Sequence, residues 1–301
     1  MRVCSFLPSA TETLYALGLG DCVAGVTFEC DYPEEARQKP VVVRTRLNHG
    51  LSPAEIDQEV TAFLRRGESL YQVDANELER IGPDLIITQD LCHVCAASPN
   101  DLVAVLSRLS RPPQMLCLSP RTLEEVWRGI RQVGEATGCA ERANRLLQEL
   151  ALRMSRVQRA VAGAQRRRTL CLEWLEPPFI AGHWIPEMVA CAGGEDVLGR
   201  ASEPGFRTDW KNVLASEAET VVLMPCGYDL RQTVEEFRRM RLPEGWQGLP
   251  AVRSGQVFAV DASGFFSRPG PRLAAGIETL ARILHPDLAP VGFPPQTVER
   301  L

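Results

Sequence analysis

Short apolar runs separated by longer helical patterns organise this chain. They lie at residues 3–7, 85–89 and 114–118 in the first half, and at residues 170–175, 221–224 and 256–260 in the second. Runs of this length that are apolar at most positions are typical of strands buried on both faces, as in parallel α/β sheets. Ligands of such sheets bind outside the carboxyl ends of the strands. The pattern therefore predicts an α/β fold with candidate sites at strand ends.

The second half of the chain repeats the first in outline. In each half an apolar run is followed by a helical segment that contains a glutamate, Glu12 or Glu187, and ends in a glycine-containing tetrapeptide (residues 18–21 and 193–196). The later apolar runs of the two halves also correspond, in the same order. This repetition predicts two similar three-layer βα lobes with right-handed crossovers.

A long helical pattern lies between the halves, from Thr122 to about Gln165, and is interrupted only near Gly138. Within it apolar side chains recur every three or four residues, at Leu147, Leu150, Met154, Val157 and Val161. A helix over residues 141–163 would be about 35 Å long at 1.5 Å per residue, which predicts a rigid linking helix. The expected organisation is an N-terminal lobe over residues 1–120, a linking helix over 121–166, a C-terminal lobe over 167–288 and an irregular tail over 289–301.

Several helix starts are marked by local motifs. Ser9 and Glu12, and likewise Ser52 and Glu55, have the spacing of a capping box, in which serine and glutamate side chains satisfy free backbone N–H groups. Glu12 is then either a cap or a ligand contact, and the free N–H groups of this helix start suit an anionic or carbonyl group of a ligand. The last helix is expected over Leu273–Leu284.

Composition narrows the function classes. The net charge of −5, with no basic stripe, gives no reason to expect a nucleic-acid partner. No apolar run approaches the roughly 18 residues needed to cross a bilayer, so membrane insertion is not expected. Met1 leads directly into a predicted core strand without a secretory signal, so a cytoplasmic location is expected if Met1 is the native start. Ten cysteines at irregular spacing then favour reduced thiols, metal ligands or core residues over a disulfide framework.

Thiols follow one predicted strand in each half. Cys92-His93-Val94-Cys95 comes after the run at 85–89, and Pro225-Cys226-Gly227-Tyr228 comes after the run at 221–224. CxxC spacing occurs in metal sites, in redox dithiols and in plain packing, and all three readings remain open. Together with Cys30, the residues Cys92, Cys95 and Cys226 form a candidate four-thiolate set for zinc or an iron–sulfur cluster.

The densest unusual stretch runs from Glu173 to Trp184. It places Trp174, Phe179 and Trp184 on or next to a loop that follows a strand. Aromatic faces with a few polar groups suit a large planar ligand. His183 is either a ligand contact or a loop residue bonded to a carbonyl.

Enzyme signatures are sparse. The chain has no P-loop, no GxSxG elbow and no HExxH motif, and no nucleophile–base pair can be assigned. A hydrolase that uses Glu173 or Glu187 with His183 is a third possibility. The balance favours a binding protein over an enzyme.

The opening Leu7-Pro8-Ser9-Ala10-Thr11-Glu12, with Gly18-Leu19-Gly20-Asp21 and Gly25-Val26-Thr27, resembles the start of helical-backbone (class III) periplasmic binding proteins for cobalamin and iron chelates. The central helix and the two lobes fit this family over most of residues 1–286. Further pieces, such as Glu29-Cys30-Asp31-Tyr32-Pro33 and Arg268-Pro269-Gly270-Pro271-Arg272, are similar to a cytosolic-type branch whose members are usually called cobalamin-binding proteins.

The resemblance implies a two-lobed receptor, like the substrate-binding protein of an ABC transporter, with a small-molecule ligand in the inter-lobe cleft. The chain departs from this pattern because it carries thiols at strand ends and shows no export signal, which puts delivery to an ABC permease in doubt. The predicted function is binding of cobalamin, a related corrinoid or another metal-containing cofactor. The alternative is a metalloprotein or redox enzyme with a cysteine-ligated iron–sulfur or zinc centre. The predicted ligand-binding residues are Ser9, Thr11, Glu12, Tyr71, Gln89, Cys92, Glu173, Trp174, His183, Trp184, Cys226, Gly227, Tyr228 and Arg268.

Overall fold

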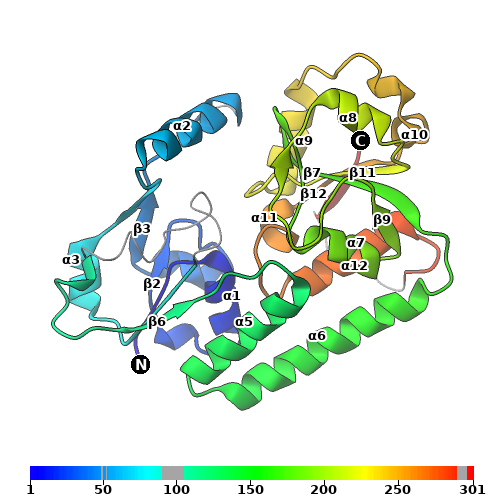
Figure 1. Ribbon diagram of the computed structural model, residues 1–301. Coiled ribbons are helices and arrows are strands. Elements are labelled where there is room, and N and C mark those ends of the chain that lie inside the picture. Colours follow the sequence, from blue (N-terminus) through cyan, green and yellow to red (C-terminus); the bar gives the residue numbers. More distant parts are fainter. Residues whose placement is uncertain (49, 52, 90–104, 290–296) are drawn as a thin grey trace. The chain divides into compact units, whose positions relative to one another are not determined.

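The computed structural model describes residues 1–48, 50–51, 53–89, 105–289 and 297–301. The chain divides into two compact units, unit 1 with residues 1–120 and 125–147, and unit 2 with residues 121–124 and 148–301. Each unit is built on its own β-sheet (Figure 1). The predicted α/β class is therefore confirmed.

Unit 1 contains a six-stranded sheet in the order β4-β3-β2-β1-β5-β6. All neighbours pair in parallel except the edge strand β4, which pairs antiparallel with β3. The strands are β1 (Val3–Ser5), β2 (Val23–Thr27), β3 (Val41–Thr45), β4 (Tyr71–Val73), β5 (Leu85–Thr88) and β6 (Gln114–Cys117). β1 and β5 are buried at every position, as expected for apolar runs in the middle of a parallel sheet.

The helices of unit 1 follow the strands in the sequence. They are α1 (Pro8–Ala16), the 3-10 helices η1 (Gly20–Cys22) and η2 (Glu34–Gln38), α2 (Pro53–Arg66) and α3 (Ala75–Ile81). Leu78 and Ile81 of α3 pack with Phe6 and Ile86 in one apolar core cluster. The burial of this face fixes α3 against the sheet.

The start of α1 differs from the predicted capping box. The helix begins at Pro8 with Leu7 as N-cap, and no side chain caps it. Proline suits this position because it has no N–H to satisfy and its φ is already helical. Ser9 and Glu12 therefore lie inside the helix, and the capping-box prediction is wrong for this pair. Ser52 of the second predicted box lies outside the described residues.

Unit 2 contains a second sheet in the order β10-β8-β7-β11-β12-β13, with β9 paired to the start of β7. Its strands are β7 (Arg167–Leu175), β8 (Pro178–Ile180), β9 (Gly194–Asp196), β10 (Phe206–Arg207), β11 (Thr220–Leu223), β12 (Val257–Val260) and β13 (Val298–Arg300). The three central strands β7, β11 and β12 are parallel. The tail was expected to be irregular, and this is wrong at β13, which pairs antiparallel with β12.

Helices complete unit 2. They are α7 (Ile185–Cys191), α8 (Trp210–Ala215), α9 (Leu230–Arg239), η3 (Trp246–Gly248), α10 (Pro250–Arg253), α11 (Ala262–Phe265) and α12 (Leu273–Leu284). The range of α12 matches its prediction. Trp246 lies at the centre of an apolar cluster, with its ring 5.9 Å from that of Trp210 and 6.0 Å from that of Phe237.

The predicted linking region contains two helices, α5 (Leu123–Ala136) and α6 (Ala140–Ala160), with Gly138 at the break. Gly138 has a φ of 69°, which a glycine adopts without strain. The 21 residues of α6 correspond to about 32 Å. Leu150 and Val157 of its apolar stripe are buried. None of the described helices combines the length and the apolar character needed to cross a bilayer.

Asp196, at the end of β9, is a buried carboxylate with one unsatisfied oxygen. Its Oδ1 accepts hydrogen bonds from the backbone N–H groups of Gly199 (2.7 Å) and Leu198 (3.2 Å). Its Oδ2 has no hydrogen-bond partner among the described residues. Burial raises the pKa of this carboxyl to about 6, against the two backbone hydrogen bonds, which lower it.

The raised pKa makes stability depend on pH. The folded state holds the Asp196 proton more tightly than the unfolded chain does. The resulting contribution to the free energy of unfolding is therefore full below pH 4 and is lost as pH rises to about 6. Asp196→Asn keeps the amide oxygen for both N–H groups and removes the buried charge. We expect it to stabilise the protein by about 1–2 kcal/mol at pH 8 and to have little effect at pH 4. Urea unfolding at both pH values measures this.

Asp209→Asn is the matched control. Asp209 is an exposed N-cap that accepts a hydrogen bond from the Asn212 N–H at 2.8 Å, and asparagine caps a helix equally well. It should leave stability unchanged at both pH values. Equal effects of Asp196→Asn at pH 4 and pH 8 would contradict the assignment.

Candidate functional site

The carboxyl ends of β7 and β11 meet at one edge of the unit 2 sheet. The two strands pair in parallel with Leu172 opposite Leu223. Beyond the ladder, the N–H of Cys226 donates to the carbonyl of Glu173 at 3.0 Å. The Pro225–Tyr228 turn is thereby held beside Glu173 and Trp174, as the strand-end argument predicts.

Trp174 and Tyr228 form an aromatic pair at this edge. Their ring centroids are 5.6 Å apart and the rings are inclined at 70°, an edge-to-face arrangement. The Tyr228 N–H donates to Pro225, and the Tyr228 carbonyl accepts from the N–H of Ser263 at 2.9 Å. Both rings are only half buried. They offer a partly open aromatic surface on a backbone held from two sides.

Cys226 and Gly227 form the exposed tip of this turn. Gly227 has a φ of 81°, a conformation that favours glycine. Its N–H donates to the Ser267 hydroxyl at 3.4 Å, close to the predicted contact Arg268. Arg268 itself is half buried. Burial raises the pKa of Asp261, and the positive charges of Arg272 and Arg268 oppose this shift.

Carboxyl groups surround the aromatic pair. Burial, and then the nearby charge of Glu176, raise the pKa of Glu236 on α9 to about 7. Burial and then the charge of Glu236 raise the pKa of Tyr228 to about 12. The Tyr228 hydroxyl lies close enough to Glu236 to affect its pKa, but neither Glu236 oxygen has a hydrogen-bond partner of normal geometry among the described residues.

His183 and Trp184 lie on the loop before α7. Trp184 is buried and its indole N–H donates to the carbonyl of Phe266 at 2.8 Å, so this ring packs into unit 2. His183 is half buried with a φ of 51°, and its ring lies 5.5 Å from that of Trp184. Burial, and then the positive charge of Arg121, lower the pKa of His183, so it is neutral at physiological pH.

Glu187 has a structural role in this arrangement. Its Oε2 accepts a hydrogen bond from the N–H of Leu123 at 2.7 Å, which satisfies one free donor at the start of α5. A carboxylate at a helix N-terminus is also favoured by the helix dipole. This geometry accounts for Glu187 without a catalytic role.

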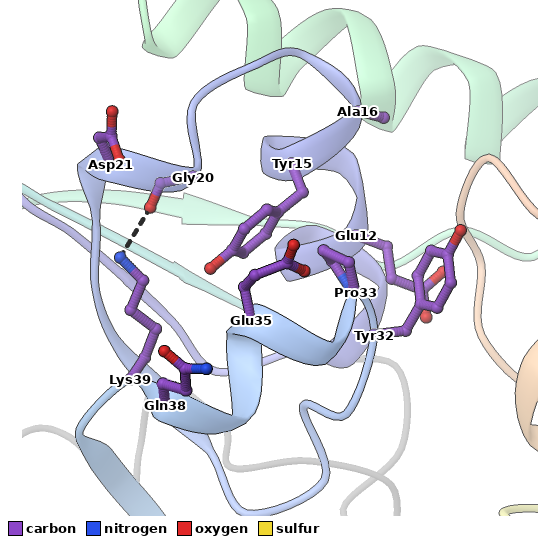
Figure 2. A pocket seen from close by; sticks show the side chains of 10 residues that line it. All are labelled: Glu12, Tyr15, Ala16, Gly20, Asp21, Tyr32, Pro33, Glu35, Gln38 and Lys39. Carbon is purple, nitrogen blue, oxygen red and sulfur yellow. Dashed lines mark hydrogen bonds between the residues drawn. The ribbon is translucent and has the colours of Figure 1, made fainter.

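Unit 1 contains a pocket of about 620 Å³ beside α1 (Figure 2). Sites for small molecules typically measure about 300–1,000 Å³. Its lining residues are Glu12, Tyr15, Ala16, Gly20, Asp21, Tyr32, Pro33, Glu35, Gln38 and Lys39. Three of them are carboxylates, whereas the single cation, Lys39, donates from its Nζ to the Gly20 carbonyl at 2.9 Å. The Tyr15 hydroxyl is buried without a partner among the described residues, and burial followed by the charges of Glu35 and Asp21 raises its pKa.

Other predicted contacts of unit 1 lie near this pocket or in the core. The Thr11 hydroxyl is 2.9 Å from that of Ser5 and 3.1 Å from the sulfur of Cys30, which is 4% exposed. Ser9 is buried inside α1. Tyr71 is half buried on β4, and Gln89 is buried after β5, with its Nε2 unpartnered among the described residues.

The thiol predictions are tested only in part. Cys92 and Cys95 lie outside the described residues. In the part of the chain that the structure describes, all eight cysteines are free, and no three His, Cys, Asp or Glu side chains gather as metal ligands. The four-thiolate zinc or iron–sulfur centre therefore stays a prediction.

Comparison with known proteins identifies the family. A model of the periplasmic binding protein family matches residues 3–263. The chain belongs to this family. Among curated members, a substrate-binding lipoprotein of an ABC transporter from Bacillus subtilis is 24% identical, covering 95% of this chain and 80% of the relative. A vitamin B12-binding protein of Vibrio cholerae is 23% identical, covering 94% and 88%.

Solved structures of periplasmic binding proteins share the fold. The vitamin B12-binding protein of Vibrio cholerae has a TM-score of 0.66 at 23% identity, covering 94% of this chain and 96% of its own. A periplasmic heme-binding protein of Pseudomonas aeruginosa has a TM-score of 0.74 at 18% identity, covering 97% and 95%. The predicted family and its helical-backbone fold are confirmed.

Three polar residues at the ring pair and the pocket are not among the residues that the sequence predicted as ligand contacts. They are Glu236, Tyr15 and Glu35. Glu236 lies three residues after the buried Thr233, so it shares a helix face that turns inward. Tyr15 and Glu35 lie on α1 and η2 and meet only because these helices pack side by side at the pocket (Figure 2). The burial of Thr233 follows from how α9 packs and is not visible in the sequence, so no local signal indicates Glu236, Tyr15 or Glu35.

The role of Glu187 as a cap can be measured. Glu187→Ala removes the acceptor for the Leu123 N–H and should cost about 1–2 kcal/mol of unfolding free energy. Glu187→Gln keeps an acceptor oxygen and should cost much less. Urea unfolding of both variants tests this, with Glu195→Ala, at an exposed glutamate of the same unit, as control. A loss in Glu187→Gln as large as in Glu187→Ala would contradict the cap.

Proposed function

We propose that this chain binds a corrinoid, cobalamin or a close relative, as its small-molecule ligand. Membership of a solute-binding family supports binding over catalysis. A curated relative named for vitamin B12 matches nearly the whole chain. The heme-binding neighbours share the fold, so the ligand class consistent with both groups is a large tetrapyrrole.

The Trp174–Tyr228 pair is the observation that carries the proposal. A half-buried pair of rings gives a macrocycle a large apolar contact at low entropic cost, because each ring has only two side-chain torsions. The turn that carries Tyr228 is held by backbone hydrogen bonds to β7 and to α11, so little ordering is needed on binding. Cys226, exposed at the tip of the same turn, would offer a thiolate to the cobalt of a bound corrinoid.

Unit 1 carries a separate candidate site of its own, the pocket beside α1. Tyr32 is an exposed aromatic ring at its rim, next to Glu12 (Figure 2). The pocket is of a size for one peripheral side chain of a corrinoid rather than for a whole corrinoid. A cytoplasmic location remains our proposal, supported by the eight unpaired cysteines of the described chain.

Corrinoid binding is tested by equilibrium dialysis against cyanocobalamin. We expect saturable binding to the purified protein, with Trp174→Ala and Tyr228→Ala each raising the Kd at least about tenfold. Absence of binding by the unaltered protein would overturn the proposal.

Trp210→Ala is the matched control for Trp174→Ala. Trp210, the first residue of α8, also forms an edge-to-face ring pair in unit 2, but with Trp246 of the apolar core. The Trp210→Ala variant should have a lower thermal stability, but its Kd for cyanocobalamin should be unchanged. If it weakens binding as much as Trp174→Ala does, the aromatic pair has no special role.

A further inference from the structure

The two kinds of tetrapyrrole that the relatives bind differ at their edges. A heme carries free carboxylates, whereas the corrin ring of cobalamin carries carboxamides. A carboxamide is neutral and donates N–H hydrogen bonds, and a carboxylate is anionic and only accepts them. The charges beside the aromatic pair therefore bear on which kind of ligand this chain admits.

Three glutamates lie beside this pair. Glu173 precedes Trp174 on β7, Glu176 lies in the turn between β7 and β8, and Glu236 lies on α9 near the Tyr228 hydroxyl. Glu176 is close enough to Glu236 for its charge to raise the pKa of that carboxyl. Two segments far apart in the sequence thus bring like charges to the same ring pair.

Glu236 is the unusual member of this group. Both of its oxygens are inaccessible to water, and neither has a hydrogen-bond partner of normal geometry among the described residues. A buried carboxylate that accepts no hydrogen bond lowers the stability of the fold. The two oxygens of Glu236 can therefore still accept hydrogen bonds. A small displacement of the Tyr228 ring on binding would open these oxygens to a ligand.

In the described part of the chain, no ion pair neutralises Glu176 or Glu236. Among the described residues neither Glu176 nor Glu236 takes part in an ion pair, whereas the neighbouring Glu235 pairs with Arg231 at 3.3 Å and with Arg239 at 3.7 Å. Within the described part of the chain, the charges of Glu176 and Glu236 are therefore not offset by an ion pair.

We propose that Glu176 and Glu236 determine ligand specificity by accepting hydrogen bonds from peripheral carboxamides and repelling peripheral carboxylates. This rests on the proposed function and narrows it to amide-bearing corrinoids over heme-like tetrapyrroles. The attraction is a charge-assisted N–H···O bond, and the repulsion is a like-charge contact that is screened least at Glu236, whose oxygens are buried. A site that uses both discriminates more sharply than one that uses attraction alone.

A matched pair of ligands tests this without changing the metal or the ring. Dicyanocobinamide carries carboxamides around the corrin and dicyanocobyrinic acid carries carboxylates, while cyanide occupies both axial positions of each. We would measure both Kd values by equilibrium dialysis at pH 8.5, above the pKa of about 7 of Glu236. The unaltered protein should bind the cobinamide at least tenfold more tightly.

Variants assign the discrimination to the two residues. Glu236→Gln and Glu176→Gln should each reduce the preference at least threefold, chiefly by tightening the binding of the acid. Glu244→Gln, at an exposed glutamate of unit 2, is the control and should leave the preference unchanged. Because Glu176 is exposed, the Glu176→Gln protein is expected to fold even if the Glu236→Gln protein does not.

The outcomes separate this inference from the proposed function. If neither corrinoid binds, the proposed function is wrong and the inference falls with it. If both bind equally, or if the preference survives in both glutamine variants, the chain is a corrinoid receptor whose specificity lies elsewhere. A preference lost in the two variants and kept in Glu244→Gln supports the inference.

Discussion

The parallel pairing of β7 with β11 is the interaction on which the candidate site depends. Its register, with Leu172 opposite Leu223, decides which residues leave the ladder together at the carboxyl edge. A slip by one residue would turn every side chain of the moved strand to the opposite face and separate Trp174 from Tyr228. The register is secured because Leu170–Leu172 of β7 and all of β11 are buried. Core packing and ligand contact are therefore set by the same ladder.

Much of the fold could be predicted because buried parallel strands have a strong sequence signal. Every predicted apolar run became a strand, and α12 has its predicted bounds because its apolar face and its Pro-Gly-Pro boundary agree. The start of α1 was misjudged because a proline at the first helical position competes with a serine cap one residue later. β13 was missed because three residues at a sheet edge carry too little pattern, and their partner β12 lies about 40 residues away.

The site was less predictable than the fold, for a physical reason. Residues directly after strands, such as Trp174 and Tyr228, could be placed because topology alone sends them to one edge. Which loop side chains turn inward depends on packing, so Trp184 and Cys30 were expected at a ligand and lie buried in their own units. Glu236 shows the converse, because a charged residue in an amphipathic helix normally faces water. Its burial follows from how α9 lies against the sheet, which the helix pattern does not show.

The cap on α5 bears on the order in which the chain folds. Glu187 lies 64 residues after Leu123, whose N–H it accepts. A ribosome releases Leu123 well before Glu187, so during synthesis the first turn of α5 waits with an open donor. From Glu125 onward the same helix belongs to unit 1, whose sheet is already complete in the emerging chain. The first turn of α5 thus depends on the folding of the second unit, although the rest of the helix belongs to the first, and this gives the nascent protein a built-in sequence of assembly.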